Sequence, residues 1–265
     1  MSRLDEVVPN HAKVVPLTID VDDGADGSVP GFLHLPPDLV SLVPATHHRT
    51  AAILLSGAGG GVNGPSSIYL SLACKLATIG SGVPVVRLDY RYPARTKYCV
   101  NDVKATMSYL EKEHGLMNFI LVGWSFGGAP VFTVGGSDSR VVGCATVASQ
   151  TADTEGIRSL APTPVLLMHG TDDRTLSYKC SERLYDQYGE KGRREIKLFD
   201  GDNHALSGNA VNVEALLCDF IDSCAVGLID KGQRNDLIEQ DLIEKEERRE
   251  LMEKGGDLRG GEHME

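Results

Sequence analysis

The sequence predicts an α/β protein built on a doubly wound, mostly parallel, eight-stranded sheet flanked by helices. Three observations predict this class. Apolar, β-rich runs alternate with stretches of helical periodicity along most of the chain. Several of the runs, such as AAILL and FILVG, are continuously apolar, as expected for strands that are covered on both faces of a parallel sheet. Two strand-like runs come first with no helix between them, which predicts an antiparallel edge.

The expected strands are short runs rich in Val, Ile, Leu and aromatic residues, separated by Gly, Pro and Asp. In chain order they span residues 11–19, 29–35, 51–57, 83–90, 118–124, 140–148, 163–170 and 193–200. The expected helices span residues 66–79, 99–114, 177–188 and 210–224. The second of these helices has Val100, Val103, Met107 and Leu110 on one stripe, as an amphipathic helix requires.

Residues 1–228 are expected to form a single domain, because a chain of 265 residues accommodates one large α/β domain. Residues 229–265 differ, since they are dense in both charges and poor in apolar residues. This composition predicts a solvated, charged helix that continues into a disordered, glycine-rich end. The apolar pairs at 237–238 and 242–243 could instead form a sticky face. A homo-oligomer formed through this tail is therefore a further expectation.

The composition excludes several classes of partner. The net charge is −11, which argues against nucleic acid, because a phosphate-binding surface needs clustered Lys and Arg. No apolar run approaches the roughly 20 residues that cross a bilayer. The first residues lack the apolar segment of a secretion signal, and the six cysteines are scattered with no C-x-x-C pair. We expect reduced thiols, no membrane partner and a cytoplasmic protein.

Ser125 lies in the stretch G-W-S-F-G, between a run that predicts a strand and a run of small, apolar residues. This pattern is typical of a nucleophile elbow, in which a sharp turn lifts the serine hydroxyl above the sheet. Gly123 and Gly127 leave room where the strand and the following helix approach each other. The backbone N–H of Phe126 would point toward the carbonyl that the serine attacks.

A serine hydroxyl needs a base within hydrogen-bond reach, and that base needs an acid to orient it. Two acids, Asp172 and Asp173, follow a strand in H-G-T-D-D, and His204 follows the next strand in G-D-N-H. The order serine, acid, histidine is the one expected for this kind of elbow. His169 is the competing base, and we interpret it as structural because it belongs to the turn at a strand end.

These three stretches, G-W-S-F-G, H-G-T-D-D and G-D-N-H, resemble the signature loops of α/β-hydrolase fold serine hydrolases, in the dienelactone-hydrolase-like branch of small, lidless enzymes. The resemblance covers about residues 48–225. It implies Asp173 rather than Asp172 as the acid. The namesake enzymes usually carry a cysteine nucleophile, so their lactone activity is not expected here. About 15 residues join the sixth and seventh expected strands, which leaves no room for a lid domain.

The glycine-rich loop at 56–67 has two interpretations. Gly59, Gly61 and Gly64 spell G-x-G-x-x-G, and Asp89 closes the next strand, as in a dinucleotide-binding site. Alternatively, the loop supplies a second oxyanion donor from the N–H of Ala58 or Gly59. Its G-A-G-G-x-x-N resembles the oxyanion loop of some small serine hydrolases, where a histidine often replaces Ser56. Only the second interpretation also explains the elbow and the late histidine.

The sequence therefore predicts a serine carboxylesterase-type hydrolase that cleaves small or exposed acyl esters through an acyl-enzyme. Ser125, Asp173 and His204 would form the triad, and Phe126 with Ala58 or Gly59 the oxyanion hole. No metal or organic cofactor is expected, and the partner is a small-molecule ester. Two alternatives stay open: a non-catalytic α/β-hydrolase-fold protein that binds a ligand or partner, and a dinucleotide-binding oxidoreductase.

Overall fold

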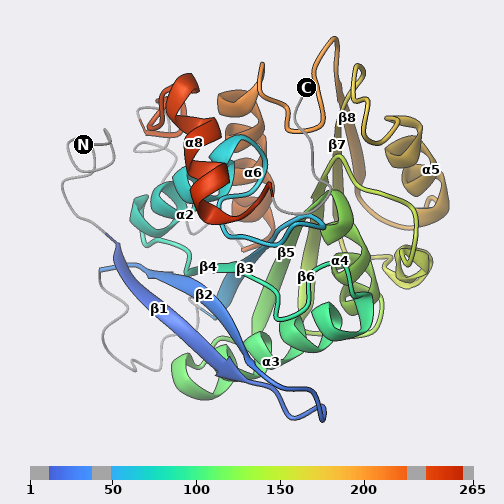
Figure 1. Cartoon of the computed structure of the whole chain (residues 1–265). Coiled ribbons are helices and arrows are strands. Elements are labelled where there is room, and N and C mark those ends of the chain that lie inside the picture. Colours follow the sequence, from blue (N-terminus) through green and yellow to red (C-terminus); the bar gives the residue numbers. More distant parts are fainter. Residues whose placement is uncertain (1–11, 38–48, 226–236, 259–265) are drawn as a thin grey trace.

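The computed structural model describes residues 12–37, 49–225 and 237–258. Eight strands form one sheet in the order β1-β2-β4-β3-β5-β6-β7-β8 (Figure 1). The strands are β1 (Lys13–Asp20), β2 (Ser28–Leu35), β3 (Thr50–Leu55), β4 (Val85–Leu88), β5 (Asn118–Trp124), β6 (Val141–Val147), β7 (Val165–Gly170) and β8 (Arg194–Phe199). β2 pairs antiparallel with both β1 and β4, and all other neighbours are parallel. The predicted mostly parallel sheet with an antiparallel N-terminal edge is confirmed.

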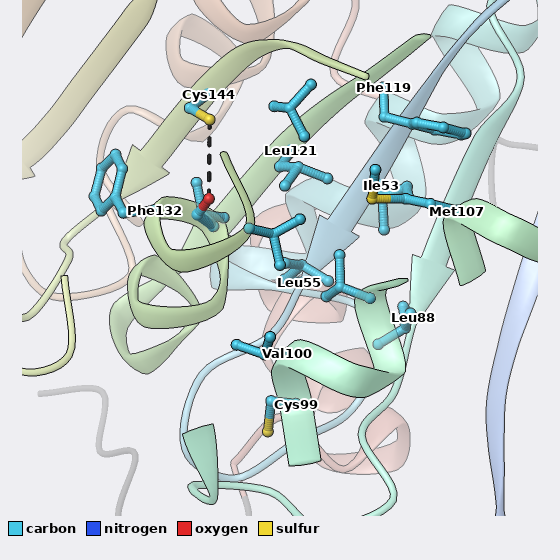
Figure 2. Close-up of a cluster of buried hydrophobic side chains, with 14 of the residues drawn as sticks. Ile53, Leu55, Leu88, Cys99, Val100, Met107, Phe119, Leu121, Phe132 and Cys144 are labelled. Carbon is cyan, nitrogen blue, oxygen red and sulfur yellow. Dashed lines mark hydrogen bonds between the residues drawn. The ribbon is translucent and has the colours of Figure 1, made fainter. Parts of the chain in front are cut away.

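Helices cover both faces of the sheet. The helices α2 (Ile68–Thr78) and α6 (Ala210–Cys224) pack on one face, and α3 (Thr96–His114), α4 (Gly128–Gly135) and α5 (Lys179–Tyr188) pack on the other (Figure 1). Alternate residues of β3 belong to the two resulting cores: Leu54 to the first, and Ile53 and Leu55 to the second. Figure 2 shows the second core. Burial on both faces explains why this strand is continuously apolar.

The parallel strands bring the predicted site residues to one edge of the sheet. The loops that carry the glycines, Ser125, Asp173 and His204 follow β3, β5, β7 and β8. Because these strands are parallel, their carboxyl ends lie at the same edge, where open α/β sheets bind their ligands. The connection between β6 and β7 holds only the short helix η3 (Glu155–Ser159), so no lid domain is inserted there.

The helix α8 (Lys245–Gly255) corrects the expectation of a solvated tail. Within residues 237–258, α8 lies against the short helix η1 (Pro65–Ser67), close to α2 (Figure 1). Leu242, Ile243 and Met252 are buried. The charged helix exists, but over these residues it is docked on the domain. The boundary at 228 stays a prediction, and the rest of the predicted tail, 229–236 and 259–265, lies outside the described residues.

A buried glutamate explains why so charged a segment is docked. Glu214 in α6 accepts hydrogen bonds from Lys75 at 2.6 Å and from Arg248 at 3.2 Å. Lys75 completes its three donations at the carbonyls of Ile238 and Gln240. Buried charges are tolerated when each is paired and hydrogen-bonded. Arg248 of α8 therefore has its partner inside the protein, whereas most other charged side chains of this helix are exposed.

The described residues contain no helix that is both long and apolar enough to cross a bilayer. All six cysteines lie among these residues, and each is a free thiol.

Candidate active site

Ser125 lies at a tight turn between β5 and α4. Its backbone is left-handed, with φ 53°, a conformation that costs a non-glycine residue about 1–2 kcal/mol. A Cβ on Gly123 would lie 2.4 Å from the Gly127 carbonyl oxygen, and one on Gly127 would lie 2.7 Å from that of Ser56. Both positions therefore require glycine. Strained backbone of this kind is found at functional sites, where the surrounding structure holds it.

Asp173 and His204 are hydrogen-bonded to each other across the loops that follow β7 and β8. The distance from His204 Nδ1 to Asp173 Oδ2 is 2.7 Å. The other carboxylate oxygen, Oδ1, accepts the backbone N–H groups of Thr175 and Leu176, each at 2.8 Å. Asp172 is exposed and has no place in this arrangement. Of the two candidate acids, the structure thus brings Asp173 to the histidine.

His169 is buried and forms a second hydrogen bond to the Asp173 carboxylate. Its Nε2 lies 3.0 Å from Asp173 Oδ2 and 2.9 Å from the Leu176 carbonyl oxygen, so it must carry the proton, since both are acceptors. Its Nδ1 then accepts a hydrogen bond from the Ser181 hydroxyl at 2.8 Å. Both ring nitrogens are thus occupied, in agreement with the structural role expected for this residue.

The Asp173 carboxylate is held in its ionised form. Burial alone would raise its pKa, but the hydrogen bonds from His169 and His204 outweigh burial and hold the pKa well below its usual range. An ionised acceptor at Nδ1 fixes the tautomer of His204, with the proton on Nδ1 and the lone pair on Nε2. The histidine is then oriented to accept a proton at Nε2.

Trp124 connects the elbow to the histidine loop. This residue precedes Ser125, and its indole N–H donates to the His204 carbonyl at 3.1 Å. The two rings lie 5.5 Å apart, centroid to centroid. Ser125 and His204 are both almost completely buried, with 4% and 2% of their surface exposed. The serine turn and the Asp173–His204 pair therefore share one compact region at the edge of the sheet.

The two candidate oxyanion elements also lie next to each other. Gly60 N–H bonds to the Gly57 carbonyl at 3.1 Å and closes a turn whose central residues are Ala58 and Gly59. Tyr90 joins this loop to the elbow. Its ring meets the Phe126 ring edge to face at 6.1 Å, and its hydroxyl donates to the carbonyl of Ser56, which precedes the turn, at 3.2 Å. The roles of Phe126, Ala58 and Gly59 as donors stay a prediction.

The same loop leaves little for a dinucleotide to bind. Asp89, the candidate ribose ligand, accepts the backbone N–H of Gly61 at 2.7 Å. The N–H groups of Asn63 and Gly64, which would face a pyrophosphate, donate to the carboxylate of Asp257 at 2.5 and 2.7 Å. The groups on which the dinucleotide interpretation depends are thus occupied by residues of the same chain.

Asp257 is the site residue that the sequence interpretation missed. It follows α8, is fully buried, and sits against the glycine loop. The pair Gly255–Gly256 signals the end of a helix, and Gly256 is indeed left-handed with φ 82°. That signal predicts a change of direction in the chain. Nothing in it ties the next residue to a loop about 190 positions earlier.

A polar hollow of about 330 Å³ opens beside His204. Its wall combines cations, acids and hydrogen-bonding groups: Arg174, Lys245, Asp172, Asp202, Asn203 and Ser207. Ser125 is not among the residues that line it. Lys245 is the first residue of α8, which means that the C-terminal segment forms part of this wall. Among the described residues, no cluster of three or more His, Cys, Asp or Glu side chains is placed to hold a metal ion.

Comparison with known proteins gives structural matches only. No family model and no curated protein match the chain. The solved structure of Est1E from Butyrivibrio proteoclasticus is 16% identical, with a TM-score of 0.62 over 80% of this chain and 99% of its own. A dienelactone hydrolase from Anabaena variabilis is 12% identical, with a TM-score of 0.65 over 80% of this chain and 98% of its own.

A third match is described as an α/β serine hydrolase without a lid, from Xanthomonas campestris. It is 14% identical, with a TM-score of 0.59 over 82% of this chain and 95% of its own. Each match covers nearly the whole of the other chain, so the likeness extends over a complete domain. This chain therefore has the α/β-hydrolase fold, with no lid domain between β6 and β7.

Proposed function

We propose that this protein is a serine hydrolase that cleaves carboxylic esters through an acyl-enzyme on Ser125. The observation that carries the proposal is the left-handed serine at a strand–helix turn, joined through Trp124 to the hydrogen-bonded pair Asp173–His204. A strained turn on its own is a structural feature. A strained serine whose neighbour Trp124 contacts a histidine that an ionised acid orients supports the pairing of a nucleophile with its base.

In the proposed reaction, His204 Nε2 takes the proton of the Ser125 hydroxyl as the oxygen attacks the ester carbonyl. Asp173 stabilises the imidazolium that forms, through the 2.7 Å hydrogen bond at Nδ1. The histidine then gives the proton to the departing alcohol, and the acyl group stays on Ser125. In the second half of the reaction, His204 takes a proton from water, which attacks the acyl-enzyme and releases the acid.

The negative charge that develops on the carbonyl oxygen would be held by backbone N–H groups. Phe126 N–H is one donor, and the N–H of Ala58 or Gly59 is the other. Such donors act in the transition state more than on the substrate, and losing one typically lowers kcat about 10²–10³-fold. The contacts that Tyr90 makes with both elements support this assignment, because they fix the elbow relative to the glycine loop.

Small or exposed acyl esters are the proposed substrates. No lid domain is inserted between β6 and β7 to enclose a long acyl chain. Hydrolysis rates for p-nitrophenyl esters of increasing chain length would test this substrate class. We expect the highest kcat/KM for the short esters, and a steady rise toward long chains would contradict it.

A fluorophosphonate probe tests the reaction type directly, because it labels only an activated serine. We expect the wild-type protein to be labelled and Ser125→Ala to be unlabelled, with esterase kcat lowered on the order of 10⁶-fold. Ser137→Ala is the matched control, because Ser137 is an exposed serine away from the site, and its labelling should equal that of the wild type.

Two outcomes would contradict the proposal. Labelling that persists in Ser125→Ala would place the reactive serine elsewhere. A well-folded wild-type protein that is neither labelled nor active on any ester of the series would favour the alternative of a non-catalytic binding protein. Quenching of NADH fluorescence on mixing with the protein would instead favour dinucleotide binding.

A further inference from the structure

The segment 237–258 contacts the candidate oxyanion loop as well as the buried Lys75–Glu214 pair. α8 packs beside η1, which immediately follows the glycine loop (Figure 1). The residue after the helix end, Asp257, reaches into that loop and is fully buried there. A buried acid usually forms an ion pair, but this one is bound by backbone N–H groups and a hydroxyl.

We propose that the segment 237–258 is a working part of the active site, and that Asp257 is a positioning residue that holds the oxyanion loop in its active shape. This inference rests on the proposed function, because the loop has a catalytic task only if Ser125 is a nucleophile. It also makes a purely structural claim about the loop, which can be tested without any catalysis.

Three hydrogen bonds attach Asp257 to both ends of the loop. One oxygen, Oδ2, accepts from Asn63 N at 2.5 Å and from Gly64 N at 2.7 Å. The other oxygen, Oδ1, lies 3.0 Å from the Ser56 hydroxyl. Ser56 begins the loop, and Asn63 and Gly64 end it. The proposed oxyanion donors lie between these attachment points, so the acid restrains the loop from both sides.

Ser56 and Gly61 transmit the restraint to the turn that holds Ala58 and Gly59. The Ser56 hydroxyl donates to the Gly61 carbonyl at 2.7 Å, which closes the loop around this turn. Gly61 is left-handed with φ 99°, and a Cβ there would lie 1.9 Å from Asp257 Oδ1. The acid therefore fills the space that a side chain at position 61 would occupy.

The Ser56 hydroxyl has one hydrogen and two acceptors within reach, the Gly61 carbonyl at 2.7 Å and Asp257 Oδ1 at 3.0 Å. The hydrogen bonds from Ser56, Asn63 and Gly64 lower the pKa of Asp257, but its burial outweighs them. Burial raises the pKa of Asp257 to about 8, and the nearby Asp89 adds to this effect, so the acid is protonated at neutral pH. Arg87 and Tyr69 are the other titratable groups that face it.

Arg248 connects the same segment, through hydrogen bonds to Ser66 and Ser67, to the loop that carries His204. It donates to the Ser66 carbonyl at 2.7 Å, and its own carbonyl accepts the Ser67 hydroxyl at 2.7 Å. Ser66 in turn donates to the carbonyl of Ala205, the residue after His204, at 2.9 Å. One segment thus supports both the loop that would hold the oxyanion and the loop that carries the base.

Two substitutions of Asp257, one by Asn and one by Ala, test whether its hydrogen bonds to the loop are needed for activity. The amide of Asp257→Asn is neutral, can accept both backbone N–H groups through its oxygen and can keep a hydrogen bond with the Ser56 hydroxyl, whereas Asp257→Ala can do neither. We expect kcat within about threefold of wild type for the Asn variant. For the Ala variant we expect a loss of about 10²–10³-fold in kcat with little change in KM, as for a displaced oxyanion donor.

A folded Asp257→Ala protein, checked by circular dichroism, with wild-type kcat would overturn the inference. An Asn variant as inactive as the Ala variant would overturn the account of a neutral acid. If the Ala variant does not fold, Ser56→Ala removes a single attachment, and an unchanged kcat in that variant would also count against the inference.

Hydrogen exchange of the amides at 56–64 gives a second readout that needs no catalysis. We expect faster exchange at this loop in Asp257→Ala than in Asp257→Asn, with no change in α3, which serves as an internal reference. Unchanged exchange at the loop would overturn the positioning role, whatever the activity. If the wild-type protein cleaves no ester while the loop responds as expected, the proposed function fails and the positioning role stands.

Discussion

Asp173 shows how one carboxylate can support two histidines in different ways. The oxygen that orients His204 also accepts from His169, and the second oxygen is held by two backbone N–H groups. Such complete solvation by protein groups keeps the acid ionised although it is buried. The hydrogen bond from His169 therefore stabilises the ionised form of Asp173.

Asp173→Asn tests the division of roles between the two neighbouring acids. An amide can present an N–H group to the Nδ1–H of His204, which favours the wrong tautomer, so we expect kcat for ester hydrolysis to fall on the order of 10⁴-fold. Asp172→Asn changes an exposed neighbour and should stay near the wild-type kcat. The assignment of the acid is wrong if the two variants behave alike.

Asp257 makes a prediction about stability and pH. Its pKa is about 8 in the folded protein, against about 3.9 in an unfolded chain. Between these values the unfolded chain releases a proton that the folded protein retains, so the free energy of unfolding falls as pH rises. The slope is up to about 1.4 kcal/mol per pH unit.

The variant Asp257→Asn has no proton to release at this position when the protein unfolds. Its stability relative to the wild type should therefore increase from pH 5 to pH 8 and level off above that, as measured by urea unfolding at each pH. A difference between the two proteins that is constant across this range would mean that the acid titrates normally in the folded state.

At the scale of single elements, the buried Glu214 joins α2, α6 and α8. Lys75 bonds to it at 2.6 Å, and both side chains are completely buried. Removing one partner of such a pair leaves an uncompensated charge in the interior. The docking of the C-terminal segment thus depends on this buried charge network, to which α8 contributes Arg248. From the sequence alone, Arg248 is expected to lie on a solvated helix.

Lys75→Met should destabilise the protein by about 3–5 kcal/mol in urea unfolding, because the buried Glu214 loses the nearer of its two cationic partners. The carbonyls of Ile238 and Gln240 lose their donor as well. Lys112→Met is the matched control. Lys112 pairs with Glu113 at 3.1 Å, but its side chain is 83% exposed, and exposed pairs contribute about 0–1 kcal/mol. Similar effects of the two substitutions would show that the Lys75–Glu214 pair does not secure the segment.

The apolar patterns of the sequence predicted the positions of most strands and helices well. The expected strand at 118–124 and the expected helix at 210–224 coincide with β5 and α6. The fourth strand is shorter than expected, 85–88 rather than 83–90, and α3 begins at residue 96 rather than 99. Such differences arise at element ends, where apolar periodicity gives no information.

Long-range pairing is what the sequence could not reveal. Ser125, Asp173 and His204 each lie in a recognisable short stretch, and the structure brings the last two together. Arg248 and Asp257 lie in a charged segment without any such pattern, and their partners are about 180 and 190 positions away. A composition that predicts a solvated tail cannot distinguish charges facing water from charges with buried partners.

At the scale of the whole molecule, an oligomer formed through the tail stays a prediction. The structure limits which surface of the tail could take part in it. Ile238, Leu242 and Ile243 are buried within their own chain, so a partner would meet the exposed charged side of α8. Contacts between exposed charges weaken as salt rises. Light scattering should then show a mass that falls toward that of one chain, 28.5 kDa, as salt is added. A single-chain mass at every salt concentration would contradict an oligomer of this kind.

The distance along the chain between Gly64 and Asp257 has a consequence for biosynthesis. They are 193 positions apart, and ribosomes add about 5–20 residues per second, so the acid is made roughly 10–40 s after the glycines it secures. Ser125, Asp173 and His204 are all made within that interval, and His204 precedes Asp257 by 53 positions. If Asp257 is needed as we propose, a growing polypeptide that already holds these three residues reaches full activity only after translation has passed this aspartate.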